Sequence, residues 1–314
     1  MKKPLILITG PTASGKTSTS VLLAQKINGE IISADSMQIY KNMDIGTAKV
    51  TPHEMCDIPH YMIDELAADQ PCSVAWFKER VTHYIETIYA KGKIPIIVGG
   101  TGFYINAILF NTNFDETKTD FTYRDELLKL AHEKGNDFLH DSLRTVDPIS
   151  ANAIHPNNVK RVVRALEYYH QTNSPISSHN EEEKSKRAQD ESPYDYTFFT
   201  LTMERERLYE RINQRVDQMI TQGLVKEVKF FFDKNYSEDL TSMKAIGYKE
   251  FFPYFKGDAS LDACIIQLKQ NTRHYAKRQL TWFTHQAKPI FVPVDKYHFD
   301  ASLIVDEMLF HLQK

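Results

Sequence analysis

Cysteine is scarce in this sequence, and the chain lacks a long hydrophobic run at its N-terminus. The three cysteines, Cys56, Cys72 and Cys264, are far apart and form no C-x-x-C pair, which argues against a zinc site and against a disulfide framework. The apolar run that follows Met1–Pro4 is too short for a signal peptide or a membrane helix. We therefore expect a cytoplasmic protein that has no membrane partner.

An excess of charge of either sign is also missing. The 314 residues include 38 lysines and arginines against 41 aspartates and glutamates, a formal net charge of −3. Such a chain has no overall attraction to nucleic acid, so a nucleic-acid partner would need a local basic patch. Apolar residues make up 42% and charged residues 25% of the sequence. These fractions are ordinary for a globular protein of one large or two moderate domains.

A phosphate-binding loop is the most informative pattern in the chain. Residues Gly10–Thr17 read GPTASGKT and directly follow the apolar run Leu5–Ile8, so the G-x-x-x-x-G-K-T pattern lies where a strand opens into a helix. Its glycines let successive backbone N–H groups point inward, and the helix N-terminus adds positive potential. We expect Lys16 to reach the phosphate oxygens and the Thr17 hydroxyl to hold Mg²⁺. The predicted phosphate ligands are Gly10, Pro11, Thr12, Ala13, Ser14, Gly15, Lys16 and Thr17.

Short, β-branched apolar segments alternate with helical segments in the first hundred residues and return near the C-terminus. This alternation predicts an α/β protein with a P-loop NTPase-like, doubly wound parallel sheet, whose ligands lie at the carboxyl ends of the strands. The turns that follow the strands should therefore meet around one site. The expected strands are Leu5–Thr9, Glu30–Ala34, Ile94–Val98, Thr197–Thr202 and Ile290–Val294, and the expected helices are Thr17–Ile27 and Val74–Lys91.

The middle of the chain has little β-signal and repeated helical periodicity, as in Glu126–Lys134 and Val159–Tyr169. We interpret residues 114–193 as a helical insertion, either a lid or a partner-binding subdomain, in a core made of residues 1–113 and 194–314. The charged run Glu181–Arg187 is either a solvated helix face or a mobile connection. A single long helix is expected from Arg205 to about Lys234.

Two further turns carry candidate chemistry. Asp35 ends an apolar run, and its carboxylate suits either a position next to Mg²⁺ or a general base aimed at a nucleophile beside the phosphates. The loop Asp35–Tyr40 adds a hydroxyl, an amide and an aromatic ring, which together suit an organic acceptor. In the third turn, Gly99–Tyr104, glycines allow close approach of the backbone to a ligand, and Thr101 would face the same cleft.

Basic residues gather in three places. Arg161 and Arg164 lie three apart and so project from one helix face. The stretch Asn271–Lys288 has no acidic residue and interleaves aromatic rings with cations, which suits single-stranded nucleic acid; the alternative is a helix that buries its aromatic and aliphatic side chains, Tyr275, Leu280 and Phe283. Four arginines of the long helix either pair with neighbouring glutamates or include one that neutralises a departing diphosphate. These are Arg205, Arg207, Arg211 and Arg215.

Together these segments resemble the bacterial tRNA dimethylallyltransferases, also called tRNA isopentenyltransferases. The matching motifs follow the order of that family over nearly the whole chain. They are GPTASGKT (Gly10–Thr17), DSMQIY (Asp35–Tyr40), DIGTAK (Asp44–Lys49), GGTGFY (Gly99–Tyr104), HPNNVKRVVRALE (His155–Glu167), AIGYKE (Ala245–Glu250) and TRHYAKRQLTWF (Thr272–Phe283).

The resemblance implies transfer of a dimethylallyl group from dimethylallyl diphosphate to the exocyclic amine of the adenine 3′ of the anticodon, in tRNAs that read codons beginning with U. It implies that the phosphate loop holds a diphosphate leaving group, with Mg²⁺ on Thr17. We expect the protein to be a monomer, although the sequence does not specify the oligomeric state. The implied catalytic residues are Asp35 as base, Thr101, Lys16 and Arg215. The implied tRNA contacts are Asp35, Ser36, Met37, Gln38, Thr101, Tyr123, Lys160, Arg161, Val162, Val163, Arg164, Met243, Lys244, Ala245, Ile246, Gly247 and Tyr248.

Three other functions share parts of these patterns. A small-molecule P-loop kinase has the same fold and loop but does not explain the basic, aromatic stretch Asn271–Lys288. An adenylate isopentenyltransferase would prenylate a free nucleotide with similar machinery, and the helical insertion argues against it. A non-catalytic RNA-binding GTPase needs an N-K-x-D motif, which the sequence does not contain.

Overall fold

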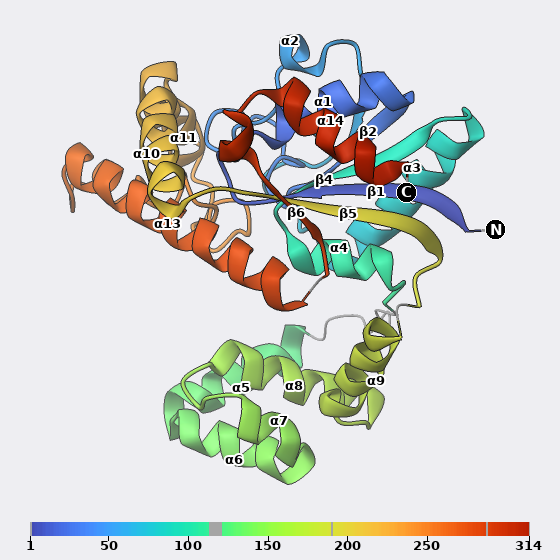
Figure 1. The fold of residues 1–314 in the computed structure, drawn as a ribbon. Helices are drawn as coiled ribbons and strands as arrows, with labels where there is room; N and C mark the ends of the chain where they lie inside the picture. The colour runs from blue at the N-terminus through green and yellow to red at the C-terminus, as the bar shows by residue number, and fades with distance from the viewer. Residues whose placement is uncertain (1, 113–120, 190, 287, 314) are drawn as a thin grey trace. The chain divides into compact units, whose positions relative to one another are not determined.

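The computed structural model describes residues 2–112, 121–189, 191–286 and 288–313. It contains two compact units, one formed by Met1–Leu109 with Pro193–Lys314 and the other by Phe110–Ser192. The first unit is built from a sheet and helices, and the second from helices (Figure 1). The boundaries expected from the sequence followed residues 113 and 193; residues 113–120, at the first of them, lie outside the described part of the chain.

The sheet of the first unit has six parallel strands in the order β3-β2-β4-β1-β5-β6, which confirms the predicted doubly wound architecture. The register places Thr9 opposite Gly99, and Gly99 opposite Ala34, so three strands end side by side. Every strand expected from the sequence is present. The additional strand, β3, has two residues and is too short to form a pattern. The strands are β1 (Lys3–Thr9), β2 (Gly29–Ala34), β3 (His60–Tyr61), β4 (Ile94–Gly99), β5 (Tyr194–Thr202) and β6 (Ile290–Pro293).

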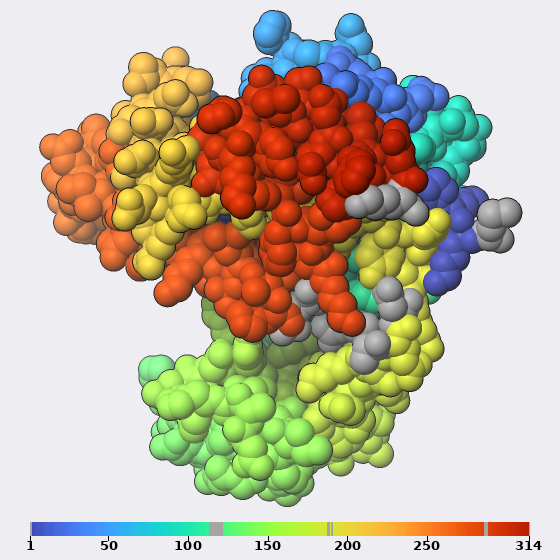
Figure 2. Space-filling model, viewed as in Figure 1, coloured from blue at the N-terminus to red at the C-terminus, as the bar shows by residue number. Residues whose placement is uncertain are grey.

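Helices pack against both faces of this sheet. On one face, α1 (Lys16–Ile27) packs against α14 (Ala301–Leu312), and their apolar side chains share a core with β1. The other face carries α4 (Gly102–Leu109), with α3 (Val74–Ala90) beside it (Figure 1). In the space-filling view α14 forms the red surface above the sheet (Figure 2). The short α2 (Pro52–Met55) begins with a capping box at Thr51.

A group of helices follows β5, where one long helix was expected. That prediction is wrong: α10 (Arg205–Gln222) ends at Gly223, and α11 (Leu224–Asp233) starts a new direction. Gly223 has φ 106°, a left-handed conformation that glycine adopts readily and that terminates helices. The group is completed by α12 (Phe252–Lys256) and the long α13 (Leu261–Gln286), and a 3₁₀ turn, Val294–Tyr297, follows β6.

The second unit is a helical subdomain with its own core. Apolar side chains of α5, α6 and α8, including Leu139, Leu143 and Leu166, pack together there. Arg124 donates two hydrogen bonds, of 2.7 and 2.8 Å, to the buried carboxylate of Glu167. The charged run that sequence left undecided is helical and belongs to α9. The helices are α5 (Phe121–Lys134), α6 (Asn136–Val146), α7 (Pro148–Ala153), α8 (Val159–Thr172) and α9 (Ile176–Ala188).

A search of the described residues found no helix with the length and apolar character needed to span a membrane.

Candidate active site

The phosphate loop joins β1 to the start of α1. Gly15 and Ala13 have positive φ angles of 87° and 65°, which curl the backbone into the expected concave turn. A Cβ atom on Gly10 would lie 2.8 Å from the carbonyl oxygen of Leu201, so this position needs glycine. Helix α1 begins at Lys16, and its first N–H groups therefore face the loop. The geometry is that of an anion-binding cradle.

Two hydroxyls of the loop have the properties that a phosphate–Mg²⁺ pair requires. The Ser14 hydroxyl is buried without a hydrogen-bond partner, which is costly unless a ligand completes it. The Thr17 side chain is partly exposed and has no hydrogen bond within the described residues. No cluster of three or more His, Cys, Asp or Glu side chains that could hold a metal occurs in the described residues. Thr17 is the side chain of this loop whose hydroxyl could hold a magnesium ion.

Lys16 is the cation of this loop, and it is partly buried. Its Nζ donates to the carbonyl oxygens of Gly10 at 3.0 Å and Pro11 at 2.7 Å. Burial and, to a smaller extent, the nearby Arg215 guanidinium lower the pKa of Lys16 to about 7, and Asp35 acts in the opposite direction. An anion bound in the loop would therefore stabilise the protonated, positively charged form of Lys16.

Two arginines one turn apart on α10 have different positions. Arg211 donates from Nε to the carbonyl oxygen of Ala13 at 2.9 Å, which ties it to the phosphate loop. Arg215 has no such bond within the described residues. Burial lowers the pKa of the Arg215 guanidinium, and the carboxylate of Asp35 raises it. Arg215 is therefore the arginine whose donors are available to a ligand, whereas Arg205 and Arg207 lie exposed at the start of the helix.

Asp35 follows β2 and starts a turn. Its Oδ1 accepts hydrogen bonds from the backbone N–H groups of Met37 at 2.9 Å and Gln38 at 3.4 Å, the usual arrangement of an aspartate that caps its own turn. The second carboxylate oxygen has no hydrogen bond within the described residues. Because Asp35 also influences the pKa values of Lys16 and Arg215, its charge lies within electrostatic reach of both cations.

The glycines of the third turn serve protein packing, which differs from the expectation that they admit a ligand. A Cβ on Gly99 would lie 2.3 Å from the carbonyl oxygen of Ala34, and one on Gly100 would lie 1.9 Å from Nε2 of Gln279. A Cβ on Gly102 would lie 2.2 Å from the ring of Trp282. The turn is therefore pressed against β2 and α13.

Thr101 lies in this turn at the end of β4 and faces α13. Burial raises the pKa of the Tyr275 hydroxyl to about 12, and the Asp35 charge adds to this shift. Hydrogen bonding of that hydroxyl with Thr101 and with Gln279 acts in the opposite direction. The Tyr275 hydroxyl therefore interacts with two candidate catalytic residues, Thr101 and Asp35.

Gln279 is a site residue that sequence reasoning missed. Its Oε1 accepts the N–H of Thr12 at 3.1 Å, and its Nε2 donates to the carbonyl oxygen of Gly100 at 3.1 Å. One buried amide therefore joins the phosphate loop to the third turn. The available signal was its place four residues after Tyr275, on the same face of one helix.

The basic stretch of α13 has a buried apolar side and an exposed charged side. Phe283 is fully buried, and Leu280 packs on the neighbouring α10 core, as in an amphipathic helix. The opposite side stays charged and exposed, and a hollow of about 520 Å³ is lined there by His274, Lys277, Arg278, Thr281, Trp282 and His285.

The predicted tRNA contacts of the first unit occupy two kinds of position. Ser36 and Met37 are partly exposed beside Asp35. The amide of Gln38 is used internally: Nε2 donates to the carbonyl oxygens of Thr47 and Ala48, each at 3.3 Å. In the segment that follows α11, Lys244 is exposed and Ile246 partly so. The buried members are Met243, Ala245, Gly247 and Tyr248, whose side chains or backbone face the protein interior.

The predicted contacts of the helical unit divide in the same way. Lys160, Arg161 and Arg164 are exposed on α8. Val162 and Val163 belong to the core of this unit, so their side chains are not surface contacts, which corrects that part of the expectation. Tyr123 is half-buried with its ring 3.9 Å from that of His170.

Comparison with known proteins agrees with these motifs. The model of the IPP transferase family matches residues 38–286. The chain belongs to the IPP transferase family. Among curated members, a tRNA dimethylallyltransferase of Lachnoclostridium phytofermentans is 51% identical over 304 residues, covering 97% of this chain and 96% of that protein. One from Bacillus cereus is 50% identical over 285 residues, covering 91% of this chain and 88% of that protein.

Solved structures of the family share the fold. A tRNA isopentenylpyrophosphate transferase of Staphylococcus epidermidis has a TM-score of 0.72 at 45% identity and covers 99% of both chains. A eukaryotic dimethylallyltransferase described as acting on tRNA has a TM-score of 0.80 at 31% identity, covering 93% of this chain and 74% of that one.

Proposed function

We propose that this protein transfers a dimethylallyl group from dimethylallyl diphosphate to the exocyclic amine of the adenine 3′ of the anticodon, in tRNAs that read codons beginning with U. The names of its relatives, tRNA dimethylallyltransferases, support both the group and the acceptor. The observation that carries the proposal is the grouping of two partly buried cations, Lys16 and Arg215, with the carboxylate of Asp35. The cations can bind the negatively charged diphosphate, and the carboxylate can accept a proton from the adenine amine.

The cations act on the leaving group. Backbone N–H groups of Ala13–Thr17, with Lys16 and Arg215, bind the diphosphate and stabilise the negative charge that grows as its bond to the allylic carbon breaks. Mg²⁺ on the Thr17 hydroxyl would add charge neutralisation at the same oxygens. The buried, unpartnered hydroxyl of Ser14 supplies one further donor.

Asp35 acts on the acceptor. The exocyclic nitrogen of adenine is a poor nucleophile, because its lone pair is delocalised into the ring. As the nitrogen forms its bond to the allylic carbon, the free oxygen of Asp35 accepts the amine proton and diphosphate departs with the electrons of the broken C–O bond. Oδ1 stays bonded to the N–H groups of Met37 and Gln38, which fixes the direction of the carboxylate. Thr101, which acts on the pKa of the Tyr275 hydroxyl, borders the acceptor in this proposal.

The tRNA must present its adenine outside the base stack for this reaction. Exposed cations of α8, Lys160, Arg161 and Arg164, suit the phosphates of the anticodon stem, and the basic, aromatic face of α13 suits unstacked bases. In this proposal the enzyme is a monomer in the cytoplasm and does not bind a membrane.

The test is transfer of label from radiolabelled dimethylallyl diphosphate, with Mg²⁺ and either an unmodified anticodon stem-loop or AMP. Label in the stem-loop alone is the expected result. Label in AMP would assign the protein to the nucleotide-prenylating branch. Consumption of ATP with a small acceptor, without any prenylation, would replace the proposal with phosphoryl transfer.

A further inference from the structure

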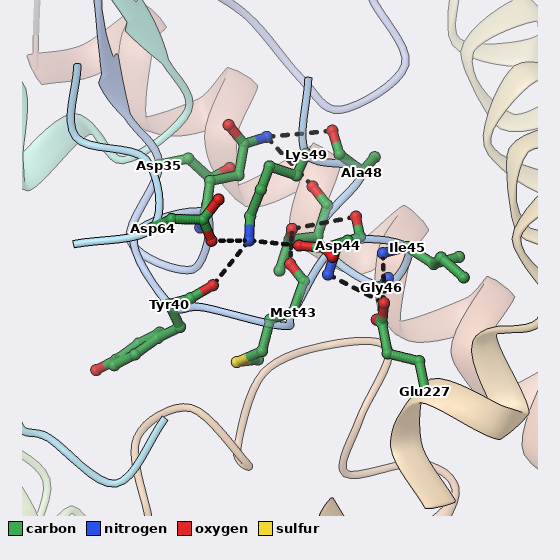
Figure 3. Close-up of polar contacts among 12 residues, drawn as sticks. Asp35, Tyr40, Met43, Asp44, Ile45, Gly46, Ala48, Lys49, Asp64 and Glu227 are labelled. Carbon is green, nitrogen blue, oxygen red and sulfur yellow. Dashed lines mark hydrogen bonds and ion pairs between the residues drawn. The ribbon is translucent and has the colours of Figure 1, made fainter. Parts of the chain in front are cut away.

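The loop Asp35–Lys49, here called the acceptor loop, is braced by a buried lysine. Lys49 Nζ donates to the carbonyl oxygen of Tyr40 at 2.8 Å and to carboxylate oxygens of Asp44 and Asp64, each at 2.6 Å (Figure 3). Its side chain is only 6% exposed. The segment Tyr40–Lys49 consists of turns and irregular structure apart from a single β-bridge residue, Tyr40. A buried ammonium with three oxygen partners holds both ends of this segment in place.

A second brace comes from outside the loop. The carboxylate of Glu227, on α11, accepts the backbone N–H groups of Asp44 at 3.0 Å, Ile45 at 2.8 Å and Gly46 at 3.0 Å (Figure 3). Three successive N–H groups directed at one carboxylate form an anion-binding turn that the protein fills itself. The Tyr248 hydroxyl donates to the same carboxylate at 2.5 Å.

Close packing keeps this second brace in one geometry. A Cβ on Gly46 would lie 2.5 Å from the Tyr248 ring, so the loop backbone lies directly on that ring. Tyr248 itself is fully buried. The acceptor loop can therefore not shift along α11 without breaking bonds to Glu227 and disturbing a packed aromatic side chain.

These braces reach Asp35 through Gln38. The Gln38 amide donates to the carbonyl oxygens of Thr47 and Ala48, next to Lys49, and its Oε1 accepts the Ser33 hydroxyl at 3.2 Å. The backbone N–H of Gln38 in turn donates to Asp35. The direction of the Asp35 carboxylate thus depends on where residues 44–49 are held.

We propose that Glu227 and Lys49 are positioning residues for prenyl transfer, which hold the acceptor loop so that the free oxygen of Asp35 meets the acceptor amine. This inference rests on the proposed function. Neither residue contacts the phosphate loop, so both act on the transfer step and not on binding of the allylic diphosphate. Helix α10 carries Arg215 on the leaving-group side of the site, and the helix that follows it, α11, carries Glu227, which holds the acceptor loop. The two sides of the site are therefore attached to one pair of packed helices.

The test compares Glu227→Gln and Lys49→Met with the unaltered protein in single-turnover transfer at saturating stem-loop. Each substitution removes charge-assisted hydrogen bonds, and we expect the transfer rate to fall about 10-fold or more. The dissociation constant of dimethylallyl diphosphate should stay within about 2-fold, because the phosphate loop is untouched. Lys49→Arg should recover part of the rate.

Matched controls remove ion pairs elsewhere in the same unit. Glu86→Gln breaks the pair with Lys3, and Lys26→Met breaks the pair with Asp306; both should transfer at the unaltered rate. Tyr248→Phe removes only the hydroxyl bonded to Glu227 and should lower the rate about 2- to 3-fold without unfolding the loop. This variant keeps the test informative if Glu227→Gln does not fold.

The outcomes separate the two proposals. Transfer rates of the folded variants within about 2-fold of the unaltered protein would overturn the positioning role. An equal loss of diphosphate affinity and transfer rate would also overturn it, since it would indicate general damage. If the unaltered protein itself transfers no label, the proposed function fails first, and this inference fails with it.

Discussion

Arg211 and Arg215 lie one helical turn apart on α10, yet only Arg211 is bonded to the phosphate loop, through Nε and the carbonyl oxygen of Ala13 at 2.9 Å. Arg215 makes no hydrogen bond to the part of the chain that the structure describes, and its charge acts on Lys16 and Asp35. Arg211 therefore supports the structure of the phosphate loop, and Arg215 is the candidate ligand of diphosphate.

Substitution of these arginines should separate the two roles. We expect Arg215→Ala to lower the transfer rate about 100-fold, because it removes a cation from the developing diphosphate charge. Arg211→Ala should lower the melting temperature and affect the rate less. The measurements are single-turnover transfer and thermal unfolding of the same preparations. A larger rate loss in Arg211→Ala would reverse the assignment.

The low pKa of Lys16 predicts uptake of a proton when diphosphate binds. Without ligand the pKa of Lys16 is about 7, and a bound anion should raise it towards the ordinary value of 10.5. At a pH between these two pKa values, Lys16 is deprotonated in the free protein and protonated in the complex. Binding therefore takes up a proton, and the affinity for diphosphate should fall as pH rises above about 7. Calorimetric titration with diphosphate at pH of about 8, in buffers of different ionisation enthalpy, measures this uptake.

Lys16→Met is the control for that experiment and should abolish the uptake. The same pKa shift affects stability of the unliganded protein. Because the unfolded chain keeps the lysine proton up to a pKa of 10.5, the contribution of Lys16 to the free energy of unfolding should increase as pH rises from about 7 to 10.5. Equal proton uptake by both proteins would show that Lys16 is not the titrating group.

Arg161 should contribute to tRNA binding by charge alone. Arg161→Ala is expected to weaken binding of the stem-loop and to make the salt dependence of the affinity shallower by about one ion. Lys129→Ala, which removes a cation paired with Glu133 on α5, is the comparison. Binding isotherms at several salt concentrations measure both slopes. An unchanged slope in Arg161→Ala would remove this residue from the RNA interface.

Gly100 and Gln279 should be energetically coupled. Gly100→Ala places a Cβ 1.9 Å from Nε2 of Gln279, and we expect it to lower the free energy of unfolding by about 1–3 kcal/mol. Gln279→Ala removes the obstructing amide, so adding Gly100→Ala to it should cost much less. Denaturant unfolding of the two single variants and the double variant measures the coupling. Additive losses would contradict the contact.

Local patterns predicted the strands and the site loops, because each strand is a short apolar run and each loop follows its strand directly. The break at Gly223 was missed since apolar periodicity continues across it, although a glycine can end a helix; its φ angle of 106° shows that it does so here. Gln279 was missed: its place four residues after Tyr275 marks the helix face, but its partner Thr12 lies 267 residues away in the chain, so the contact itself has no local signal. The choice between Arg211 and Arg215 likewise depended on which guanidinium bonds to Ala13.

The central claim is that Asp35 accepts the amine proton while the phosphate loop holds the diphosphate. Its most direct measurement is nucleoside analysis of an anticodon stem-loop after incubation with dimethylallyl diphosphate and either unaltered protein or Asp35→Ala. The account predicts isopentenyladenosine 3′ of the anticodon with the unaltered protein, and none with Asp35→Ala although the variant binds the stem-loop within a few-fold. Full modification by Asp35→Ala would contradict the account.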